Sequence, residues 1–425
     1  MWIPYRYAIV GLPTILITYG ICHVIYQQQC VISYSSTNKR FVSNFDILVN
    51  LTSLPHYESL FYKVNIVDEI IRAVNGSPMT PLADYKTPCW FAVINKEYKK
   101  SKKGRIHLSS VEKNNDTARP STGLRCLPYA MIIGVSKSGT TDLFYRLSKH
   151  PEVFPSSRKE VRFWSKLRIG TTAVSEFPRE EMSFTEYIYY FHEAARGIQE
   201  YTEIMNGKPY HPGIAMEATP HYLWDYAGWE TVPGNIHLSE PRFTLPDTLR
   251  VLEPELKFIV MLRNPVDRSF KVEYFQDIFA VSHEKSWNIG CYLSQISEED
   301  YLSLAQMFEE EHHQRGGITL NAGMYSVFLG DWFKVYPKSH FHIIKAENYY
   351  REVSSTLGEV FAFLGIKQLD DKLMDNIKEE SVQNSNKSNS TEPMLPETRQ
   401  LLNDLYKPFN GELAELLGNT EYLWK

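Results

Sequence analysis

The sequence lacks several features that would decide its class at once. Its 425 residues include only 5 cysteines, and neither the 22 glycines nor the 23 prolines are in excess, which excludes a disulfide scaffold and a collagen-like chain. There is no excess of positive charge, because 45 Lys and Arg face 50 Asp and Glu and give a formal net charge of −5. A general nucleic-acid binder is therefore not expected. Aromatic residues make up 13% of the chain, which excludes a disordered protein.

Metal-ligand spacing is also missing. No C-x-x-C or Cys…His pattern is present, so we expect no metal to be required. Cys89 and Cys126 lie beside the start of the apolar part of the chain. In an oxidising compartment we expect these two to form a disulfide that closes a loop of moderate length.

The N-terminal region contains a long uncharged segment. Residues 7–26 hold no Asp, Glu, Lys or Arg, and about 20 apolar residues span a bilayer as a helix. No small-residue cleavage site follows closely, which favours a retained signal anchor after a cytoplasmic tail of residues 1–6. The alternative is a buried core helix. Glycosylation sequons agree with a luminal body and lie at Asn50, Asn115, Asn386 and Asn389.

The remainder divides into a stem and a folded domain. Residues 27–120 are polar, irregular and broken by prolines, which is typical of a stem and linker. Short apolar runs then begin, and three of them are typical of buried parallel strands: residues 129–135, 257–262 and 341–344. Helical patterns follow two of these runs, and Pro265 opens a helix after the other. We expect residues 121–425 to form one α/β domain with a central, mostly parallel sheet.

The strongest local motif is the octet GVSKSGTT at residues 134–141, between a strand and a helix. It nearly fits the P-loop pattern G-x-x-x-x-G-K-[ST], but its lysine is Lys137, and Thr140 stands at the usual lysine position. Backbone N–H groups at a helix start, with the helix dipole, form an anion site. A kinase needs its lysine on the β and γ phosphates, so the position of Lys137 favours a shorter ligand. The alternative is an ordinary tight turn.

A strand followed by G-x-x-K-x-G-T-T resembles the 5′-phosphosulfate loop of Golgi-type sulfotransferases, whose donor is 3′-phosphoadenosine 5′-phosphosulfate (PAPS). Residues 262–268 (LRNPVDR) resemble the segment with which this family grips the 3′-phosphate. The resemblance covers roughly residues 87–425. It is closest to the N-acetylgalactosamine 4-sulfate 6-O-sulfotransferase (carbohydrate sulfotransferase 15) family, and more distant for the heparan sulfate N- and 3-O-sulfotransferases. It implies a P-loop-like, PAPS-dependent sulfotransferase fold, preceded by the transmembrane anchor and stem.

The resemblance also implies donor-binding residues. Arg263 carries a forked guanidinium that suits a phosphate dianion. Lys271 stands where the family has Ser and can contact phosphate as a point charge, and Lys387 lies near the basic residues that close over the donor in relatives. The expected donor-binding set is Lys137, Ser138, Gly139, Thr140, Thr141, Arg263, Lys271 and Lys387.

The expected catalytic groups are a base and a cation, because sulfuryl transfer deprotonates the acceptor and charges the leaving oxygen. Residues 159–164 (KEVRFW) resemble the K-E-x-x-F-[FW] segment whose Glu acts as base in relatives, which assigns Glu160. Lys137 would stabilise the leaving phosphate oxygen. Glu217 resembles the acidic residue lining the relatives' acceptor cleft, and is the second catalytic and acceptor-binding candidate.

Acceptor binding is expected at a basic patch, residues 156–168, which surrounds Glu160 and includes Lys159 and Arg162. Such a patch suits a sulfated polymer. The alternatives are structural: Glu160 as a surface carboxylate neutralised by Lys159 and Arg162, and Glu217 as a capping or salt-bridge residue.

Together these observations predict a single-pass type II Golgi membrane protein with a luminal catalytic domain. It would transfer sulfate from PAPS to a glycosaminoglycan hydroxyl, the 6-position of N-acetylgalactosamine 4-sulfate in chondroitin or dermatan sulfate. One alternative is a non-catalytic luminal glycan-binding protein on the same fold. Another is a P-loop kinase, which the displaced Lys137 disfavours. The sequence does not fix the oligomeric state.

Overall fold

The computed structural model describes residues 79–94, 98–100, 106–108, 121–164, 183–224, 244–270, 320–379, 394 and 396–424. These residues belong to two compact units. The larger lies within Val64–Arg263 and Val327–Lys387, and the smaller within Asn264–Ser326 and Ser388–Lys425. The predicted anchor, Lys271 and Lys387 lie outside the described residues. Among the residues that are described, no helix is long and apolar enough to cross a membrane.

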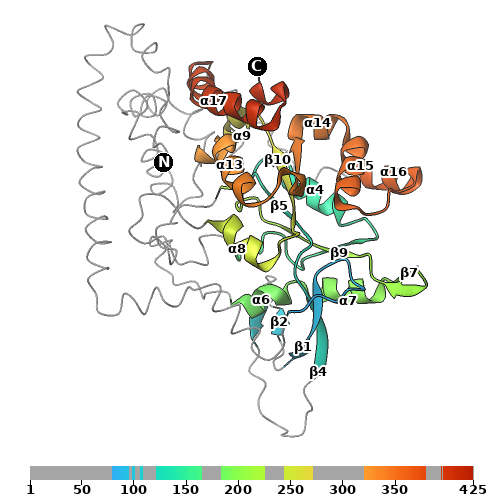
Figure 1. The fold of residues 1–425 in the computed structure, drawn as a ribbon. Helices are drawn as coiled ribbons and strands as arrows, with labels where there is room; N and C mark the ends of the chain where they lie inside the picture. Colours follow the sequence, from blue (N-terminus) through green and yellow to red (C-terminus); the bar gives the residue numbers. More distant parts are fainter. Residues whose placement is uncertain are drawn as a thin grey trace, which may run out of the picture. The chain divides into compact units, whose positions relative to one another are not determined.

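The larger unit is organised around a five-stranded sheet with the strand order β11-β10-β5-β9-β6. Figure 1 labels its strands β10, β5 and β9. All four neighbouring pairs are parallel. The five strands are β5 (Ala130–Gly134), β6 (Val153–Pro155), β9 (Ile214–Ala218), β10 (Lys257–Leu262) and β11 (Phe341–Lys345). In β5 and β9 every residue is buried, as expected for parallel strands covered on both faces. The predicted parallel sheet is confirmed.

Helices cover one face of this sheet through a shared apolar core. Leu143 and Phe144 of one helix and Val360 and Phe361 of another are buried against Ile132 and its neighbours in the strands. Figure 1 shows these helices grouped together beside the sheet: α4 (Thr140–Leu147), α14 (Ala346–Arg351), α15 (Val353–Leu364) and α16 (Asp371–Lys378). Two of them correspond to helices that the apolar spacing predicted at residues 140–150 and 354–364. α15 agrees with this prediction to within one residue, and α4 ends at Leu147, three residues before the predicted end.

The rest of the larger unit includes short helices and an antiparallel hairpin. Phe258 of β10 packs against Trp332 and Tyr336, and α6 begins with a capping box formed by Ser183 and Glu186. The elements are α6 (Phe184–Tyr189), α7 (His192–Glu200), β7 (Glu203–Met205), β8 (Lys208–Tyr210), α8 (Leu245–Leu252), α13 (Tyr325–Val335) and the 3₁₀ helix η6 (Lys338–His340).

The folded region begins earlier than the predicted boundary at residue 120. β1 (Cys89–Ile94) pairs antiparallel with β4 (Ser121–Cys126), and the predicted Cys89–Cys126 disulfide is confirmed. Upstream, the Thr87 hydroxyl donates to the Gly213 carbonyl at 3.0 Å and accepts from the Ala215 N–H at 3.0 Å. These contacts correct the stem prediction, since the irregular composition hid residues that pair with distant strands. β2 (Tyr98–Lys100) and β3 (Ile106–Leu108) form another antiparallel pair.

The smaller unit is helical in its described part. It contains α9 (Pro265–Phe270), η5 (Asn321–Gly323), α17 (Pro396–Leu417) and η7 (Thr420–Leu423). Arg268 is 0% exposed, and Tyr406 donates to the Leu320 carbonyl at 2.9 Å and contacts the Ser269 hydroxyl at 3.1 Å. In the LRNPVDR segment, the second arginine is thus a buried core residue.

Candidate active site

The phosphate loop joins β5 to α4 at the carboxyl edge of the sheet. Its backbone is held by the Val135 N–H, which donates to the Met261 carbonyl of β10 at 2.9 Å. Lys137 (φ 67°) and Gly139 (φ 103°) have left-handed conformations. Gly139 is required on two counts, because φ is positive and a Cβ there would lie 2.4 Å from the Tyr350 hydroxyl. The loop is therefore a tight, preorganised strand-to-helix turn.

Polar groups of this loop fit an anion. The Ser138 side chain is buried, and its hydroxyl has no hydrogen-bond partner among the described residues. Lys137 is exposed, while Thr140 and Thr141 begin α4, where the first backbone N–H groups have no intrahelical acceptor. A buried hydroxyl without a partner, next to such N–H groups, is what a phosphate or sulfate would satisfy.

An acidic residue in the first turn of α4 is neutralised. Asp142 accepts from the Arg146 guanidinium at 2.8 Å and from the Tyr349 hydroxyl at 2.6 Å. All three side chains are buried. The positive charge of Arg146 offsets the Asp142 carboxylate, so the carboxylate does not cancel the anion-binding character of the helix start.

Arg263 lies at the end of β10, the strand next to β5. Its guanidinium donates to the Lys137 carbonyl at 3.3 Å, and the residue is half-buried. Since β5 and β10 are parallel neighbours, their carboxyl ends bring Arg263 and the phosphate loop together. The predicted donor residues Lys137 to Thr141 and Arg263 thus share one edge, whereas Lys271 and Lys387 lie outside the described residues.

The loop that carries Glu160 follows β6 and runs along the end of β9. The Ser156 N–H donates to the Met216 carbonyl and the Glu160 N–H to the Ala218 carbonyl, each at 2.8 Å. β9 is also the other neighbour of β5. The loop with the proposed base and the phosphate loop therefore leave the sheet at the same edge, from neighbouring positions.

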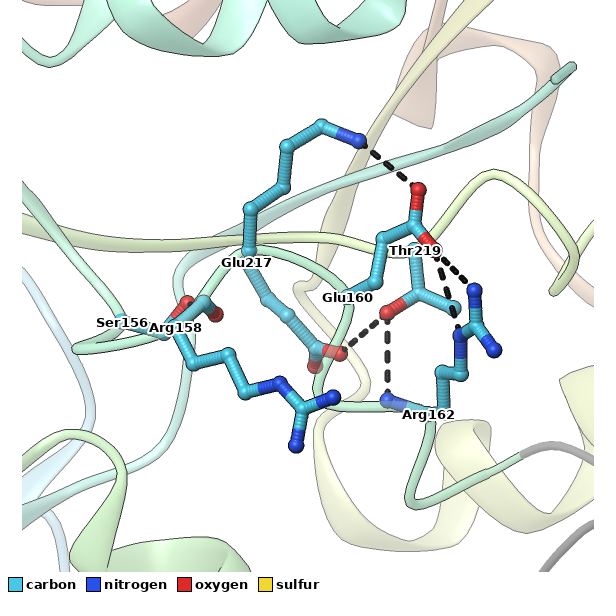
Figure 2. A network of polar contacts seen from close by, with 7 residues as sticks. Ser156, Arg158, Glu160, Arg162, Glu217 and Thr219 are labelled. Carbon is cyan, nitrogen blue, oxygen red and sulfur yellow. Dashed lines mark hydrogen bonds and ion pairs between the residues drawn. The ribbon is translucent and has the colours of Figure 1, made fainter. Parts of the chain in front are cut away.

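Both carboxylate oxygens of Glu160 are engaged by cations. Lys159 Nζ lies 3.0 Å from Oε1, and the Arg162 guanidinium reaches Oε2 with Nε at 3.1 Å and a terminal nitrogen at 2.5 Å (Figure 2). Burial acts to raise the pKa of Glu160, but Lys159 and Arg162 outweigh it and lower the pKa to about 2. The sequence left open that Glu160 is a surface carboxylate neutralised by Lys159 and Arg162. Both of these ion pairs are present, in the same loop as the predicted base.

Three of the five non-glycine residues that have a positive φ in the described part of the chain lie in the phosphate loop and the Glu160 loop; the other two are Asn206 and Trp424. Glu160 (φ 59°) and Arg162 (φ 62°) join Lys137 as non-glycine residues in the left-handed region. Each such residue costs of order 1–3 kcal/mol and persists only where its surroundings hold it. Strain of this kind gathers at functional sites, which supports the assignment of both loops to one site.

Glu217, on β9, differs from Glu160 in having no exposed surface. It is 0% exposed and accepts from the hydroxyls of Tyr187 (2.7 Å), Tyr222 (2.7 Å) and Thr219 (2.9 Å). Burial raises its pKa, against the opposing effect of these donors. The predicted contact between Glu217 and a sugar does not fit this burial, because the protein's own hydroxyls fill the space around the carboxylate.

Glu217 instead connects to the Glu160 loop from behind. The Thr219 hydroxyl donates to Glu217 and accepts from the backbone N–H of Arg162 at 3.3 Å (Figure 2). Glu217 therefore fixes the turn at Arg162. Sequence reasoning did not find Tyr187, which comes from α6 and is separated from Glu217 by 30 positions. Thr219 and Tyr222 lie in the same MEATPHY segment as Glu217. The sequence predicted Tyr222 only as an aromatic residue for the core or for stacking on a sugar, and it predicted no role for Thr219.

The chain belongs to the sulfotransferase family. Residues 127–400, more than half of the chain, match the family described as "Sulfotransferase domain". Among its relatives, "Carbohydrate sulfotransferase 15" of Homo sapiens is 32% identical over 314 residues, which cover 71% of this chain and 55% of that protein. "Heparan sulfate glucosamine 3-O-sulfotransferase 6" of Homo sapiens is 25% identical over 247 residues, covering 58% and 55%. The predicted resemblances to the carbohydrate sulfotransferase 15 family and to heparan sulfate 3-O-sulfotransferases are confirmed.

The chain spans about half the length of the curated relatives it matches. A solved sulfotransferase from Alicyclobacillus acidocaldarius aligns over 69% of this chain and 96% of that chain, with 19% identity and a TM-score of 0.40. Among the described residues, no group of three or more His, Cys, Asp or Glu side chains is arranged to hold a metal ion.

Proposed function

We propose that this protein transfers sulfate from PAPS to a hydroxyl group of a glycosaminoglycan. The observation that carries the proposal is the placement of the phosphate loop and the Glu160 loop at one edge of the sheet, after neighbouring strands. One loop fits the anionic donor and the other offers a carboxylate between two cations. Family membership agrees with this chemistry.

On the donor side, the residues present would hold the two charged ends of PAPS. Lys137, Ser138 and the first N–H groups of α4 would bind the 5′-phosphosulfate, and Arg263 the 3′-phosphate. As the reaction proceeds, negative charge develops on the oxygen between phosphorus and sulfur. Lys137 would stabilise that charge.

On the acceptor side, Glu160 takes the proton of the attacking hydroxyl. The acceptor oxygen uses its electron pair to form the new S–O bond, and the bond from sulfur to the bridging phosphate oxygen breaks. That electron pair stays on the 5′-phosphate of the product, 3′-phosphoadenosine 5′-phosphate (PAP). The proton ends on Glu160 and passes to solvent, so atoms and charges balance.

For the acceptor, we propose the 6-hydroxyl of N-acetylgalactosamine 4-sulfate in chondroitin or dermatan sulfate. The similarity to carbohydrate sulfotransferase 15 and the cations Lys159 and Arg162 beside Glu160 support a sulfated acceptor. We further propose a single-pass type II Golgi membrane protein with a luminal body. The uncharged segment at residues 7–26 and the Cys89–Cys126 disulfide, which suits an oxidising compartment, support this placement.

The test is a transfer assay with the full-length chain, ³⁵S-labelled PAPS and a panel of glycosaminoglycans. We expect label in chondroitin 4-sulfate or dermatan sulfate, at the 6-position of the galactosamine. PAP binding without transfer to any acceptor would favour the non-catalytic glycan-binding alternative. Transfer of label from γ-labelled ATP, in place of PAPS, would favour the kinase.

A further inference from the structure

The ion pairs around Glu160 raise a problem for the proposed chemistry. A general base works best when its pKa is near the working pH, whereas Lys159 and Arg162 lower the pKa of Glu160 to about 2. With a cation on each oxygen, the carboxylate is a weak proton acceptor and part of its capacity to accept hydrogen bonds is already used. Movement of one of the two cations would make Glu160 a stronger base.

The two cations differ in how easily they can leave. The Lys159 side chain is 10% exposed, whereas the Arg162 side chain is 40% exposed and Glu160 between them is 27% exposed. An approaching acceptor therefore meets Arg162 first. The Arg162 backbone is meanwhile tied down, because its N–H donates to the Thr219 hydroxyl that Glu217 holds. A change in the position of its side chain would therefore leave the backbone turn at Glu160 in place.

Resting on the proposed function, we propose that Arg162 makes catalysis depend on an anionic group of the acceptor. Without acceptor, Arg162 holds Glu160 in an ion pair. A sulfate group on the acceptor offers the guanidinium a bidentate partner, and Arg162 turns toward it. Oε2 of Glu160 is then clear to accept the proton of the attacking hydroxyl. Arg162 is thus a specificity-determining residue, since the acceptor's own sulfate releases the base.

The charges around Glu160 agree with this order of events. In the described part of the chain, the charged groups that act on Glu160 are Lys159 and Arg162 of its own loop. Behind the loop, on β9, Glu217 is separated from it by the Thr219 hydroxyl. Loss of Arg162 from Oε2 removes a major force lowering the pKa of Glu160, so the pKa rises and the carboxylate becomes a better base.

The experiment compares two acceptors of equal length, a chondroitin 4-sulfate hexasaccharide and an unsulfated chondroitin hexasaccharide. Full-length wild type, Arg162→Gln and the matched control Arg196→Gln, at an exposed arginine of α7 outside the basic patch, are assayed with PAPS for kcat and KM. Wild type should favour the sulfated hexasaccharide in kcat as well as in KM. Arg162→Gln should raise kcat on the unsulfated hexasaccharide by roughly tenfold, a fraction of the about 10²–10⁴ that a positioned base contributes.

The pH profile separates release of the base from simple binding. In Arg162→Gln, the acid limb of kcat/KM for the unsulfated acceptor should move to higher pH, because the cation that lowers the pKa is gone. Arg196→Gln should leave the limb in place, since Arg196 pairs with Glu200 and the charges that act on Glu160 are those of Lys159 and Arg162. If Arg162 only binds the acceptor, Arg162→Gln will raise KM for the sulfated hexasaccharide and leave kcat for the unsulfated one unchanged. That result would overturn the inference.

Control measurements keep the outcomes distinct. Arg162→Gln should bind PAP as tightly as wild type does. If PAP binding is lost, the discrimination between the two hexasaccharides is measured in Arg162→Lys instead. That variant keeps the charge without the fork and should discriminate less than wild type; equal discrimination overturns the inference. If wild type transfers sulfate and Arg162→Gln still prefers the sulfated hexasaccharide to the same degree, this inference alone is overturned. Absence of transfer by wild type to either hexasaccharide overturns the proposed function and this inference together.

Discussion

Glu160 and Glu217 are two carboxylates at the same edge of one sheet, and their surroundings have opposite effects. Glu160 lies on a loop, 27% exposed, between Lys159 and Arg162, which lower its pKa to about 2. Glu217 lies on β9, 0% exposed, among three hydroxyl groups, and burial raises its pKa. Divergent environments of this kind assign different roles to chemically identical groups. Cations that can leave suit a base, while fixed hydroxyls suit a residue that positions the base.

The largest expected effect that separates the two carboxylates is on the rate of transfer. Glu160→Gln keeps the size of the side chain but removes the proton acceptor, so kcat should fall by about 10²–10⁴-fold. PAP binding, followed by calorimetry, should be unchanged, because Glu160 is not part of the phosphate loop. Glu217→Gln is the matched control and should lose less. A larger loss of kcat in Glu217→Gln would reverse the two roles.

The donor side provides the next test, because Lys137 is exposed in the phosphate loop. Lys137→Ala should lower kcat by about 10²–10³-fold, since charge on the leaving oxygen loses its stabilising group. Lys149→Ala, an exposed lysine just after α4, serves as the matched control and should retain the wild-type rate. Equal rates for Lys137→Ala and wild type would remove Lys137 from the mechanism.

Substitution of Glu217 should lower the stability of the fold more than substitution of Glu160, which is the reverse of the order expected for kcat. Glu217→Ala leaves the hydroxyls of Tyr187, Thr219 and Tyr222 without their acceptor, so the free energy of unfolding should fall by at least about 2 kcal/mol. Glu160→Ala breaks ion pairs that are partly exposed and should change it by less than about 1 kcal/mol. Urea denaturation of both variants measures the difference, and equal losses would contradict the proposed positioning role of Glu217.

The smallest effect is the pH dependence of stability, where the two carboxylates should have opposite signs. The pKa of Glu160 falls from 4.5 to about 2 on folding, so its contribution is present above pH 4.5 and is lost as the pH falls toward 2. The pKa of Glu217 rises above 4.5, so its contribution is full below 4.5 and is lost as the pH rises through the folded-state value. The free energy of unfolding is measured by denaturation between pH 2 and 7 for wild type, Glu160→Gln and Glu217→Gln. The difference between wild type and each variant, plotted against pH, should therefore slope in opposite directions for the two variants.

Several parts of the fold could be predicted because their signals are local. The apolar runs of β5, β10 and β11 are uninterrupted, and the octet of the phosphate loop is a contiguous motif. β6 and β9 were not predicted. β6 has only three residues, and β9 contains Glu217, whose charge interrupts the apolar pattern. β1 was hidden in a polar region, since its pairing with β4 depends on residues about thirty positions away.

The same distinction runs through the site. By itself, the sequence determined that a lysine and a glycine shape the turn before α4, and that Lys159 and Arg162 accompany Glu160, because these residues lie within a few positions of one another and short-range sterics and charge govern them. Only the tertiary structure decided that Glu217 is buried among hydroxyls and holds the turn at Arg162. Tyr187 reaches it from α6, and the desolvation that sets its pKa arises only when strands and helices pack around β9.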